Sequence, residues 1–417
     1  MNQQGQADAL SVEEARAAIR RSINPIIATE LSSLRAALGR VLAEDIISPI
    51  DVPAADNSAM DGYALSGKLL DNDAPCRLKI VGGAFAGRPF SGGIGPGECI
   101  AITTGALLPA GCDTVVPLEF ALDATPTHVT LPAHAVPPGA NRRLAGEDLQ
   151  RGSIALAKGK ILRPADIGLL ASLGRADVPV VRRLRVAFFS TGDELRSIGE
   201  TLDAGCVYDS NRYTLQAMLT RLGCEAIDLG VVRDDPETLE ATLREACTEA
   251  DAIVTSGGVS VGAADYTRQI MAQLGAVDFW KIAMRPGRPM AFGRIASDGQ
   301  SAYLFGLPGN PVAVMVSFYM IARDALLHLM GAQTAPLPLL SVPTRATIRK
   351  KPGRTEFQRG FLMPDEQGRV AVSLTGPQGS GILRSMSEAN CMVVLPHESG
   401  DVEAGQAVDV MLFDGLI

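Results

Sequence analysis

Several chemical signatures are missing from this 417-residue sequence, and each absence removes a class of protein. Its seven cysteines include no CxxC pair and are too sparse for a disulfide framework in a chain of this length. Only four histidines are present, and none belongs to a Cys/His ligand pattern, which argues against a zinc site. There is no G-x-G-x-x-G, and no glycine-rich loop ends in the Lys-Ser/Thr of a P-loop. Neither ordinary nucleotide-binding fingerprint therefore applies.

Long apolar runs and dense basic runs are missing as well. The most apolar stretch, residues 312–322, is too short to span a bilayer, and the N-terminal residues lack the basic and apolar regions of a signal peptide. We therefore expect a soluble protein of the reducing cytoplasm that does not use a membrane. The formal net charge of -8 argues against nucleic-acid binding. It does not exclude small anions, which need only a local basic cluster.

The length and the local patterns predict several domains, and the first of them combines helices with a β-rich insertion. Ser11 and Glu14 form a capping-box pattern that opens a helix through about residue 23. The leucine spacing at 31–44 predicts a second helix, and a third begins at Pro164 and stops at Gly174. Between them, short β-like runs at 77–81, 99–103, 114–118 and 129–131 alternate with Gly/Pro turns. We expect this first unit to be elongated.

From residue 182 onward, strands alternate with helices, as expected for a parallel sheet covered on both faces. The predicted strands are 186–190, 226–232, 252–255, 277–283, 290–295 and 302–305, and the predicted helices are 211–222, 236–249, 265–274 and 311–330. After a Pro-rich linker at 334–338, the runs 369–374, 391–395 and 407–413 predict a small β-barrel or sandwich.

A glycine-rich loop follows the strand predicted at 252–255. Ser256, Gly257, Gly258 and Ser260 continue into an acid, Asp265. Glycines let the backbone approach a phosphate closely, and free N–H groups with serine hydroxyls can hold an anion. Alone, the loop is as consistent with a plain glycine turn as with a phosphate loop.

Polar residues also follow the other predicted strands, and their coincidence is more informative than any one of them. Glu194, Asp234 and Asp265 supply carboxylates at strand ends, which together with a phosphate favour a Mg²⁺ site over three unrelated loop charges. Lys281, Arg285 and Arg288 surround a Pro-Gly turn, and their donors suit tetrahedral oxyanions. The residues alone predict a multi-domain protein that binds a phosphorylated or oxyanionic ligand with Mg²⁺.

The ordered motifs DNSAMDGYA, TTGA, GED, STGDEL, SGGVSVGAAD, MRPGRP, LPGNPV and GRTEFQRG resemble the molybdopterin molybdenumtransferase family. The resemblance implies insertion of molybdenum from molybdate into adenylylated molybdopterin, with Mg²⁺-dependent release of AMP, the final step of molybdenum cofactor biosynthesis. It also implies a homodimer with four domains per subunit. These are an elongated N-terminal helical and linker domain (1–50 and 149–180), a β-rich insertion domain (51–148), an α/β molybdopterin-binding domain (181–333) and a C-terminal β-barrel (334–417).

The resemblance also assigns residue roles. Catalytic roles fall on Asp56, Asp148, Glu194, Asp234, Asp265 and Lys281, with Glu194, Asp234 and Asp265 as metal ligands. Substrate-binding roles fall on Thr104, Ser256, Gly257, Gly258, Ser260, Arg285, Pro308, Asn310, Pro311, Arg359 and Ser380. The implied partners are a second subunit, which shares the cleft, the molybdopterin adenylyltransferase and acceptor molybdoenzymes.

Two departures from the family pattern bear on these roles. Arg285 and Arg288 stand where many relatives have lysines, which preserves charge but alters hydrogen-bond geometry, so Lys281 is the firmer molybdate ligand. Ala263 replaces an acid common in this loop, leaving Asp265 as the nearby carboxylate. An adenylyltransferase and a non-catalytic scaffold are the rival functions, beside a sugar- or nucleotide-phosphate-binding protein, which the number of ordered motifs argues against. The long N-terminal half disfavours the first, and the retained acids and bases disfavour the second.

Overall fold

The computed structural model describes residues 9–259, 265–364 and 367–416. The chain divides into two compact units. Unit 1 comprises Met1–Ala43, Gly159–Arg163 and Asp177–Ile417, and unit 2 comprises Glu44–Lys158 and Pro164–Ala176.

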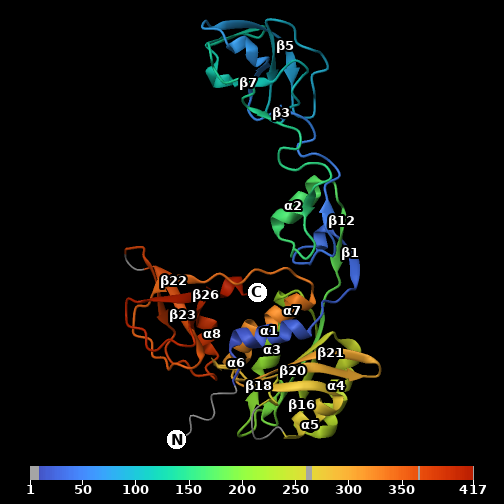
Figure 1. Ribbon diagram of the computed structural model, residues 1–417, viewed down its shortest axis with the longest axis vertical. Helices are drawn as coiled ribbons and strands as arrows, with labels where there is room; N and C mark the ends of the chain where they lie inside the picture. Colours follow the sequence, from blue (N-terminus) through green and yellow to red (C-terminus); the bar gives the residue numbers. More distant parts are fainter. Residues whose placement is uncertain (1–8, 260–264, 365–366, 417) are drawn as a thin grey trace. The chain divides into compact units, whose positions relative to one another are not determined.

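The centre of unit 1 is a six-stranded sheet (Figure 1). Its order is β16 (Glu225–Val232), β13 (Arg185–Thr191), β17 (Ala252–Ser256), β21 (Gln300–Leu307), β20 (Pro289–Ser297) and β18 (Gly275–Lys281). The first four strands run parallel, as predicted. The expectation of a parallel sheet is wrong for β20, which is antiparallel to both of its neighbours, β21 and β18, whereas β18 again runs in the direction of the first four strands. The short Asp298–Gly299 turn joins β20 to β21 as a hairpin, which requires antiparallel pairing.

Helices cover both faces of this sheet, in agreement with the prediction (Figure 1). Val186 and Phe188 of β13 face one core, with α3 (Ser210–Arg221), α6 (Pro311–Ser317) and α7 (Arg323–Leu329). Ala187 and Phe189 face the other, with α4 (Pro236–Glu249) and α5 (Asp265–Leu274). This alternation is the two-residue period of a strand buried on both sides.

The apolar helix predicted at 311–330 consists of α6, a π-helical stretch Phe318–Ala322 and α7. Pro311–Leu329 is long and apolar enough to cross a membrane by length and composition alone, but 72% of its most apolar stretch is buried in the structure. Val312, Val316 and Leu326 belong to the core of unit 1. The burial is that of a core helix.

The N-terminal part of unit 1 contains one confirmed helix and one wrong prediction. Helix α1 (Val12–Ser22) begins with the predicted capping box, in which Ser11 and Glu14 bond reciprocally. The helix predicted at 31–44 is absent, because β1 (Thr29–Ser33) pairs antiparallel with β12 (Asp177–Val181) and only a short 3₁₀ turn follows. Leu31 is 72% exposed, so the leucine spacing does not mark a core face.

The last part of unit 1 is a second sheet whose strands lie close to the predicted runs. Its order is β19 (Met284–Arg285), β23 (Thr355–Pro364), β25 (Cys391–Leu395), β26 (Ala407–Leu412) and β22 (Leu340–Pro343), with β24 (Val370–Leu374) paired to β23. Arg285 of β19 therefore lies beside Glu356 of β23, although the two are 71 positions apart in the sequence. This pairing brings the C-terminal sheet to the basic loop.

Unit 2 is built on a six-stranded sheet of order β7-β4-β6-β5-β9-β8. The four predicted β-like runs are confirmed as β5 (Cys76–Ala84), β6 (Glu98–Ile102), β7 (Thr114–Pro117) and β9 (His128–Leu131), and they join β4 (Gly62–Leu65) and β8 (Asp123–Ala124). The helix predicted from Pro164 is α2 (Pro164–Ser172), which also belongs to unit 2.

Candidate active site

Topology alone places most of the predicted site residues of unit 1 along one edge of the central sheet. The carboxyl ends of β16, β13, β17 and β21 share this edge because these strands are parallel. The carboxyl end of β18 shares it too, since β18 and β21 both run antiparallel to β20. Asp234, Glu194, Gly257, Pro308 and Lys281 thus follow one another along the edge in the order β16, β13, β17, β21, β18.

The glycine-rich loop begins where β17 ends, as predicted. Gly257 has φ +96°, and a Cβ on it would lie 2.5 Å from the carbonyl oxygen of Thr191, so only glycine fits without displacement. Its N–H donates to Leu307 O at 3.0 Å, which ties the loop to the end of β21. Ser260 lies outside the described residues, and so does the side chain of Asp265, whose backbone opens α5.

The loop between β21 and α6 carries Pro308, Asn310 and Pro311. Asn310 occupies the N-cap position, and its carbonyl accepts from Val314 N at 2.9 Å. Within the described part of the chain, its side chain makes no capping hydrogen bond, and the residue is exposed. The Asn310 amide is therefore open to a ligand at the sheet edge.

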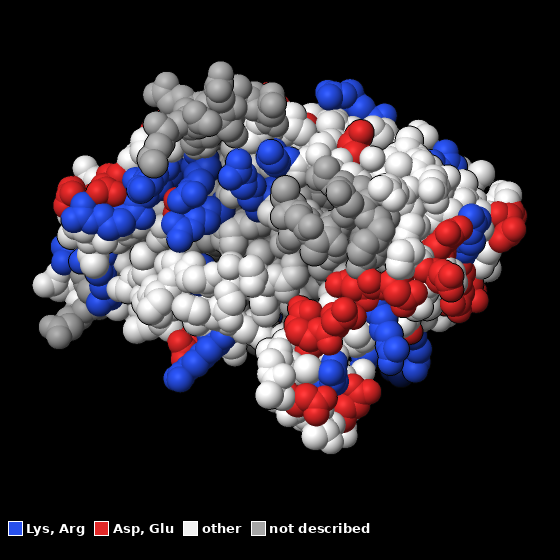
Figure 2. Space-filling model, turned by 90° about the horizontal axis from the view of Figure 1, so that it is seen from below, with Lys and Arg blue, Asp and Glu red and all other residues white. Residues whose placement is uncertain are grey.

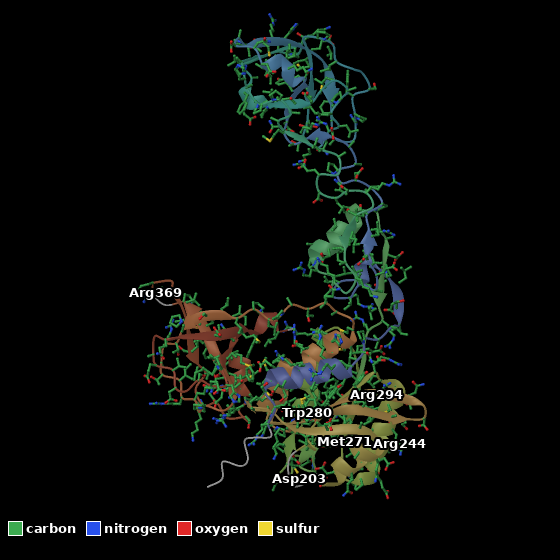
Figure 3. All side chains as sticks on the ribbon, viewed as in Figure 1. Asp203, Arg244, Met271, Trp280, Arg294 and Arg369 are labelled. Carbon is green, nitrogen blue, oxygen red and sulfur yellow. The ribbon has the colours of Figure 1, made fainter. Side chains whose placement is uncertain are left out.

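The acidic end of the edge gathers Asp193, Glu194 and Asp234. Burial raises the pKa of Asp234, and the negative charges of Asp193 and Glu194 raise it further. Asp203, which Figure 3 shows at the lower border of unit 1, pairs with Arg196 at 3.5 Å, and Arg196 donates to the Asp193 carbonyl at 2.9 Å. A carboxylate held among like charges is a favourable place for a cation.

The donor chemistry of this cluster fits Mg²⁺. Among the residues that the structure describes, no group of three or more His, Cys, Asp or Glu is arranged to hold a metal ion. Mg²⁺ usually takes only one or two protein carboxylates, with water and substrate phosphate completing its octahedron. Asp234 and Glu194 satisfy that smaller requirement.

The opposite end of the edge is basic. Lys281, Arg285 and Arg288 are all exposed, and Arg285 and Arg288 line a cavity of about 450 Å³ with Arg354, which directly precedes β23. Figure 2 shows Lys and Arg gathered in the left half of this face and Asp and Glu in the lower right. Trp280 packs on Phe292 of β20, with ring centroids 5.5 Å apart, and thereby anchors the strand before Lys281 (Figure 3).

Glu356 lies between two of the three guanidiniums that line this cavity, those of Arg285 and Arg354. It is only 2% exposed, and its Oε1 accepts from Arg354 Nε at 2.9 Å. Its Oε2 lies 3.9 Å from an Arg285 nitrogen. The carboxylate offsets repulsion between these two arginines, and the exposed Arg285 guanidinium can still donate to an anion.

Arg359 and Ser380 contribute to the site differently from what the motifs alone indicate. Arg359 is 1% exposed, and it donates to Ser385 Oγ at 2.9 Å and to the carbonyls of Gln378 and Gly379. Burial and then repulsion from Arg285 lower its pKa to about 10. The Ser380 carbonyl in turn accepts from Val312 N at 3.0 Å. In this structure Arg359 shapes the loop that meets α6.

The predicted residues of unit 2 lie among local hydrogen bonds. Asp56 accepts from Ala145 N and from Arg142 Nε, both at 2.8 Å, and the Ala145 bond is the main cause of its lowered pKa, with Arg142 adding to it against burial. Thr104 donates its N–H and its hydroxyl to Asp61 Oδ1. Asp148 is exposed, and its N–H donates to Val52 O.

Two residues at the start of α3 were not identified from the sequence. Asp209, 1% exposed, accepts from Ser190 Oγ at 3.0 Å, and Asn211, 6% exposed, donates to Ser256 Oγ at 2.7 Å. The only signal was Asp209 in an N-cap position, which is common at any helix start.

Comparisons with known proteins cover almost the whole chain. Residues 10–174 match the MoeA N-terminal region (domain I and II), residues 187–328 a probable molybdopterin binding domain, and residues 341–413 the MoeA C-terminal region (domain IV). A molybdopterin molybdenumtransferase from Haemophilus influenzae is 40% identical over 98% of this chain and 100% of its own length. One from Nostoc is 35% identical over 92% and 88%. This chain belongs to the molybdopterin molybdenumtransferase family.

A solved structure supports the same assignment at the level of the fold. The molybdopterin biosynthesis moeA protein from Pyrococcus horikoshii superposes with a TM-score of 0.82 at 29% identity, covering 97% of this chain and 100% of the other. The multi-domain fold of the family, with its molybdopterin-binding domain, is thereby confirmed. All candidate residues fall within the matched regions.

Proposed function

We propose that this chain inserts molybdenum from molybdate into adenylylated molybdopterin and releases AMP, the last step of molybdenum cofactor biosynthesis. Its relatives carry the name of that transferase activity. The observation that carries the proposal is the ordered edge of the central sheet, with acids at β16 and β13, the glycine loop at β17, and basic residues beyond β18. Adjacent strands lie about 4.8 Å apart, so β13 and β18 are roughly 19 Å apart.

This spacing suits one extended ligand with phosphate at its centre. The phosphate linkage would lie against Ser256, Gly257 and Gly258, where the Gly258 N–H and the Ser256 hydroxyl can donate hydrogen bonds to it, since the Gly257 N–H is already bonded to Leu307 O. Asp234 and Glu194, with Asp265, would hold Mg²⁺, which would neutralise charge on the departing AMP. Lys281 and Arg285 would hold molybdate beside the dithiolene.

The residues themselves then act by placement and electrostatics. Asn310, Pro308 and Pro311 would border the ligand at the end of β21, and Arg359 and Ser380 would support the molybdate end from the C-terminal sheet. No covalent enzyme nucleophile is required, since bringing two reactants together in one cleft lowers the entropic barrier by itself.

The remaining assignments of the family form part of the proposal. Asp56, Thr104 and Asp148 would reach the site of a partner subunit in a homodimer. We keep the four-domain division at 1–50 with 149–180, 51–148, 181–333 and 334–417. A bridge between Thr344 and Val372 supports curling of the C-terminal sheet into a barrel. A cytoplasmic location, exchange with the adenylyltransferase and delivery to acceptor molybdoenzymes complete the proposal.

The test combines purified protein, adenylylated molybdopterin, molybdate and Mg²⁺. AMP release is measured together with reconstitution of a cofactor-free molybdenum enzyme. We expect both to require molybdate and to be lost in Asp234→Ala. AMP release without active cofactor would indicate hydrolysis alone, and no binding or AMP release would indicate a scaffold.

A further inference from the structure

Asn211 is a buried amide that bonds two different loops of the proposed site. It lies in the first turn of α3, is 6% exposed, and has its Nδ2 2.7 Å from Ser256 Oγ and 2.7 Å from the Gly309 carbonyl oxygen. Ser256 opens the glycine-rich loop, and Gly309 belongs to the loop before α6. These loops touch each other, because a Cβ on Gly309 would lie 3.8 Å from Gly257 Cα.

The orientation of this amide follows from its partners. A backbone carbonyl only accepts hydrogen bonds, so the atom facing Gly309 O must be the nitrogen. Both amide protons are then committed, one to each loop. Among the described residues, Asn211 Oδ1 is buried without a hydrogen-bond partner. A buried acceptor left unsatisfied costs free energy of folding. The two hydrogen bonds that Asn211 Nδ2 donates therefore matter more at this position than the unpaired oxygen.

Hydrogen bonds at the start of α3 hold the backbone that carries the Asn211 amide in place. Asp209, the preceding N-cap residue, accepts from Ser190 Oγ at 3.0 Å and from Arg212 N at 3.1 Å. Ser190 belongs to β13, the neighbour of β17 in the sheet. One helix start is therefore bonded to β13 through Asp209, and to the end of β17 and the loop after β21 through Asn211.

We infer that Asn211 is a positioning residue for the proposed reaction, holding the phosphate-binding loop and the Gly309 loop at a fixed separation. The inference rests on the proposed function for the identity of the ligand, an adenylylated pterin phosphate. The role of Asn211 in holding the two loops together does not depend on the proposed function. Asn211 acts through Ser256 and Gly309 and does not contact the reacting atoms.

The test uses the full-length protein with Asn211→Asp, Asn211→Ala and the control Gln216→Ala. Asn211→Asp keeps the shape but sets an acceptor against the Gly309 carbonyl, and because the same atom bonds Ser256 and Gly309, its movement away from this carbonyl should lower the protection of both loops. Gln216 lies on the same helix, and its side chain bonds Thr220 on the next turn. In hydrogen exchange, we expect faster exchange in segments 255–259 and 306–310 of both Asn211 variants and wild-type exchange there in Gln216→Ala.

Kinetics supply the second readout. Misplacing reacting groups by about 1 Å can cost roughly a hundredfold in rate, so we expect kcat for AMP release to fall about 10- to 100-fold in protein that is still folded. Unchanged exchange in both segments, or a kcat within about twofold of wild type in Asn211→Asp, would overturn the inference. If the wild-type protein releases no AMP but both Asn211 variants still show faster loop exchange, the proposed function is refuted. The role of Asn211 in holding the two loops together is then retained.

Discussion

Asp234 is the carboxylate whose surroundings bear most directly on function at the scale of single residues. Its pKa is raised first by burial and then by Asp193 and Glu194, so its ionised form is disfavoured in the folded protein. A carboxyl with a raised folded pKa stabilises the fold below its unfolded pKa, near 3.9, and this contribution is lost as pH rises through the folded value. At neutral pH the charge therefore opposes folding until a cation is bound.

We expect Asp234→Asn to raise the thermal unfolding midpoint of the metal-free protein at pH 7 and to weaken Mg²⁺ binding at least about tenfold, the lower limit seen for groups that only support a metal ligand. The midpoint of the variant should exceed that of the wild type by an amount that grows as pH rises above about 4, where the unfolded carboxyl ionises. Calorimetric melting and Mg²⁺ titration measure both effects. Asp235→Asn, which keeps the cap on α4, is the control, and equal Mg²⁺ affinity in the two variants would contradict the assignment.

Arg285 is the second residue whose role follows from its neighbours. Glu356 lies 3.9 Å from it and is itself bonded by Arg354, so this guanidinium is oriented as well as charged. We expect Arg285→Ala to raise the molybdate concentration for half-maximal insertion about 10- to 100-fold, the range for losing a charged hydrogen bond. Arg285→Lys should have a smaller effect because it keeps the charge.

The control for Arg285 is Arg294→Ala. Arg294 lies on β20, where it bonds Ser301 and stacks over Tyr303, and Figure 3 shows it toward the right of unit 1, away from the basic half of Figure 2. Its loss should leave the molybdate dependence unchanged. A molybdate dependence of Arg285→Ala equal to that of Arg294→Ala would remove Arg285 from the site.

At the scale of elements, the site depends on how strands end. β17 is followed directly by Gly257, whose φ is +96° and whose missing Cβ leaves room for the Thr191 carbonyl of the adjacent strand. A loop of this kind presents backbone N–H groups to a ligand only while two neighbouring strand ends stay in close contact.

Gly257→Ala should therefore lose most AMP-release activity and destabilise the protein by about 1–3 kcal/mol, through backbone strain and the 2.5 Å approach to Thr191 O. Gly299→Ala is a matched control, with φ +75° but nothing within 4 Å of the added Cβ. Gly299→Ala should lose stability through backbone strain alone and keep its AMP-release activity. Denaturant unfolding and AMP release separate the two, and full activity in Gly257→Ala would exclude the loop from the site.

At the scale of the molecule, the predicted residues are divided between two compact units. Asp56, Thr104 and Asp148 belong to unit 2, whereas the acids, the glycine loop and the basic residues belong to unit 1. If unit 2 of one subunit completes the proposed site in unit 1 of its partner, a variant inactivated in unit 2 and a variant inactivated in unit 1 should complement each other in a mixed dimer. A site formed within one subunit would show no such complementation.

Mixing inactive Asp56→Ala with inactive Asp234→Ala, after dissociation and reassembly, should restore about a quarter of wild-type activity, because half of randomly formed dimers are mixed and each carries one intact site. The mixture of Glu194→Ala with Asp234→Ala should restore none, since both changes fall on the same cluster. AMP release and sedimentation of the mixtures provide the measurement. Absence of restoration in a confirmed mixed dimer would argue against a shared site.

The sequence by itself determined most of the elements and the residue types of the site. Strands such as β13 and β17 are continuous apolar runs, so their burial on both faces follows from composition. The capping box at Ser11 and the glycine loop at Gly257 are local signals, which need no distant partner to be recognised.

The tertiary structure decided what depends on distant partners. β1 is a strand because Asp177–Val181 pairs with it, and β20 runs antiparallel because a two-residue turn joins it to β21. Arg359 is buried by a loop some 20 residues away, and Asn211 reaches Ser256 and Gly309 across 45 and 98 positions. Local propensity and spacing carry no information on such contacts, because they form only when the sheet brings its strand ends to a common edge.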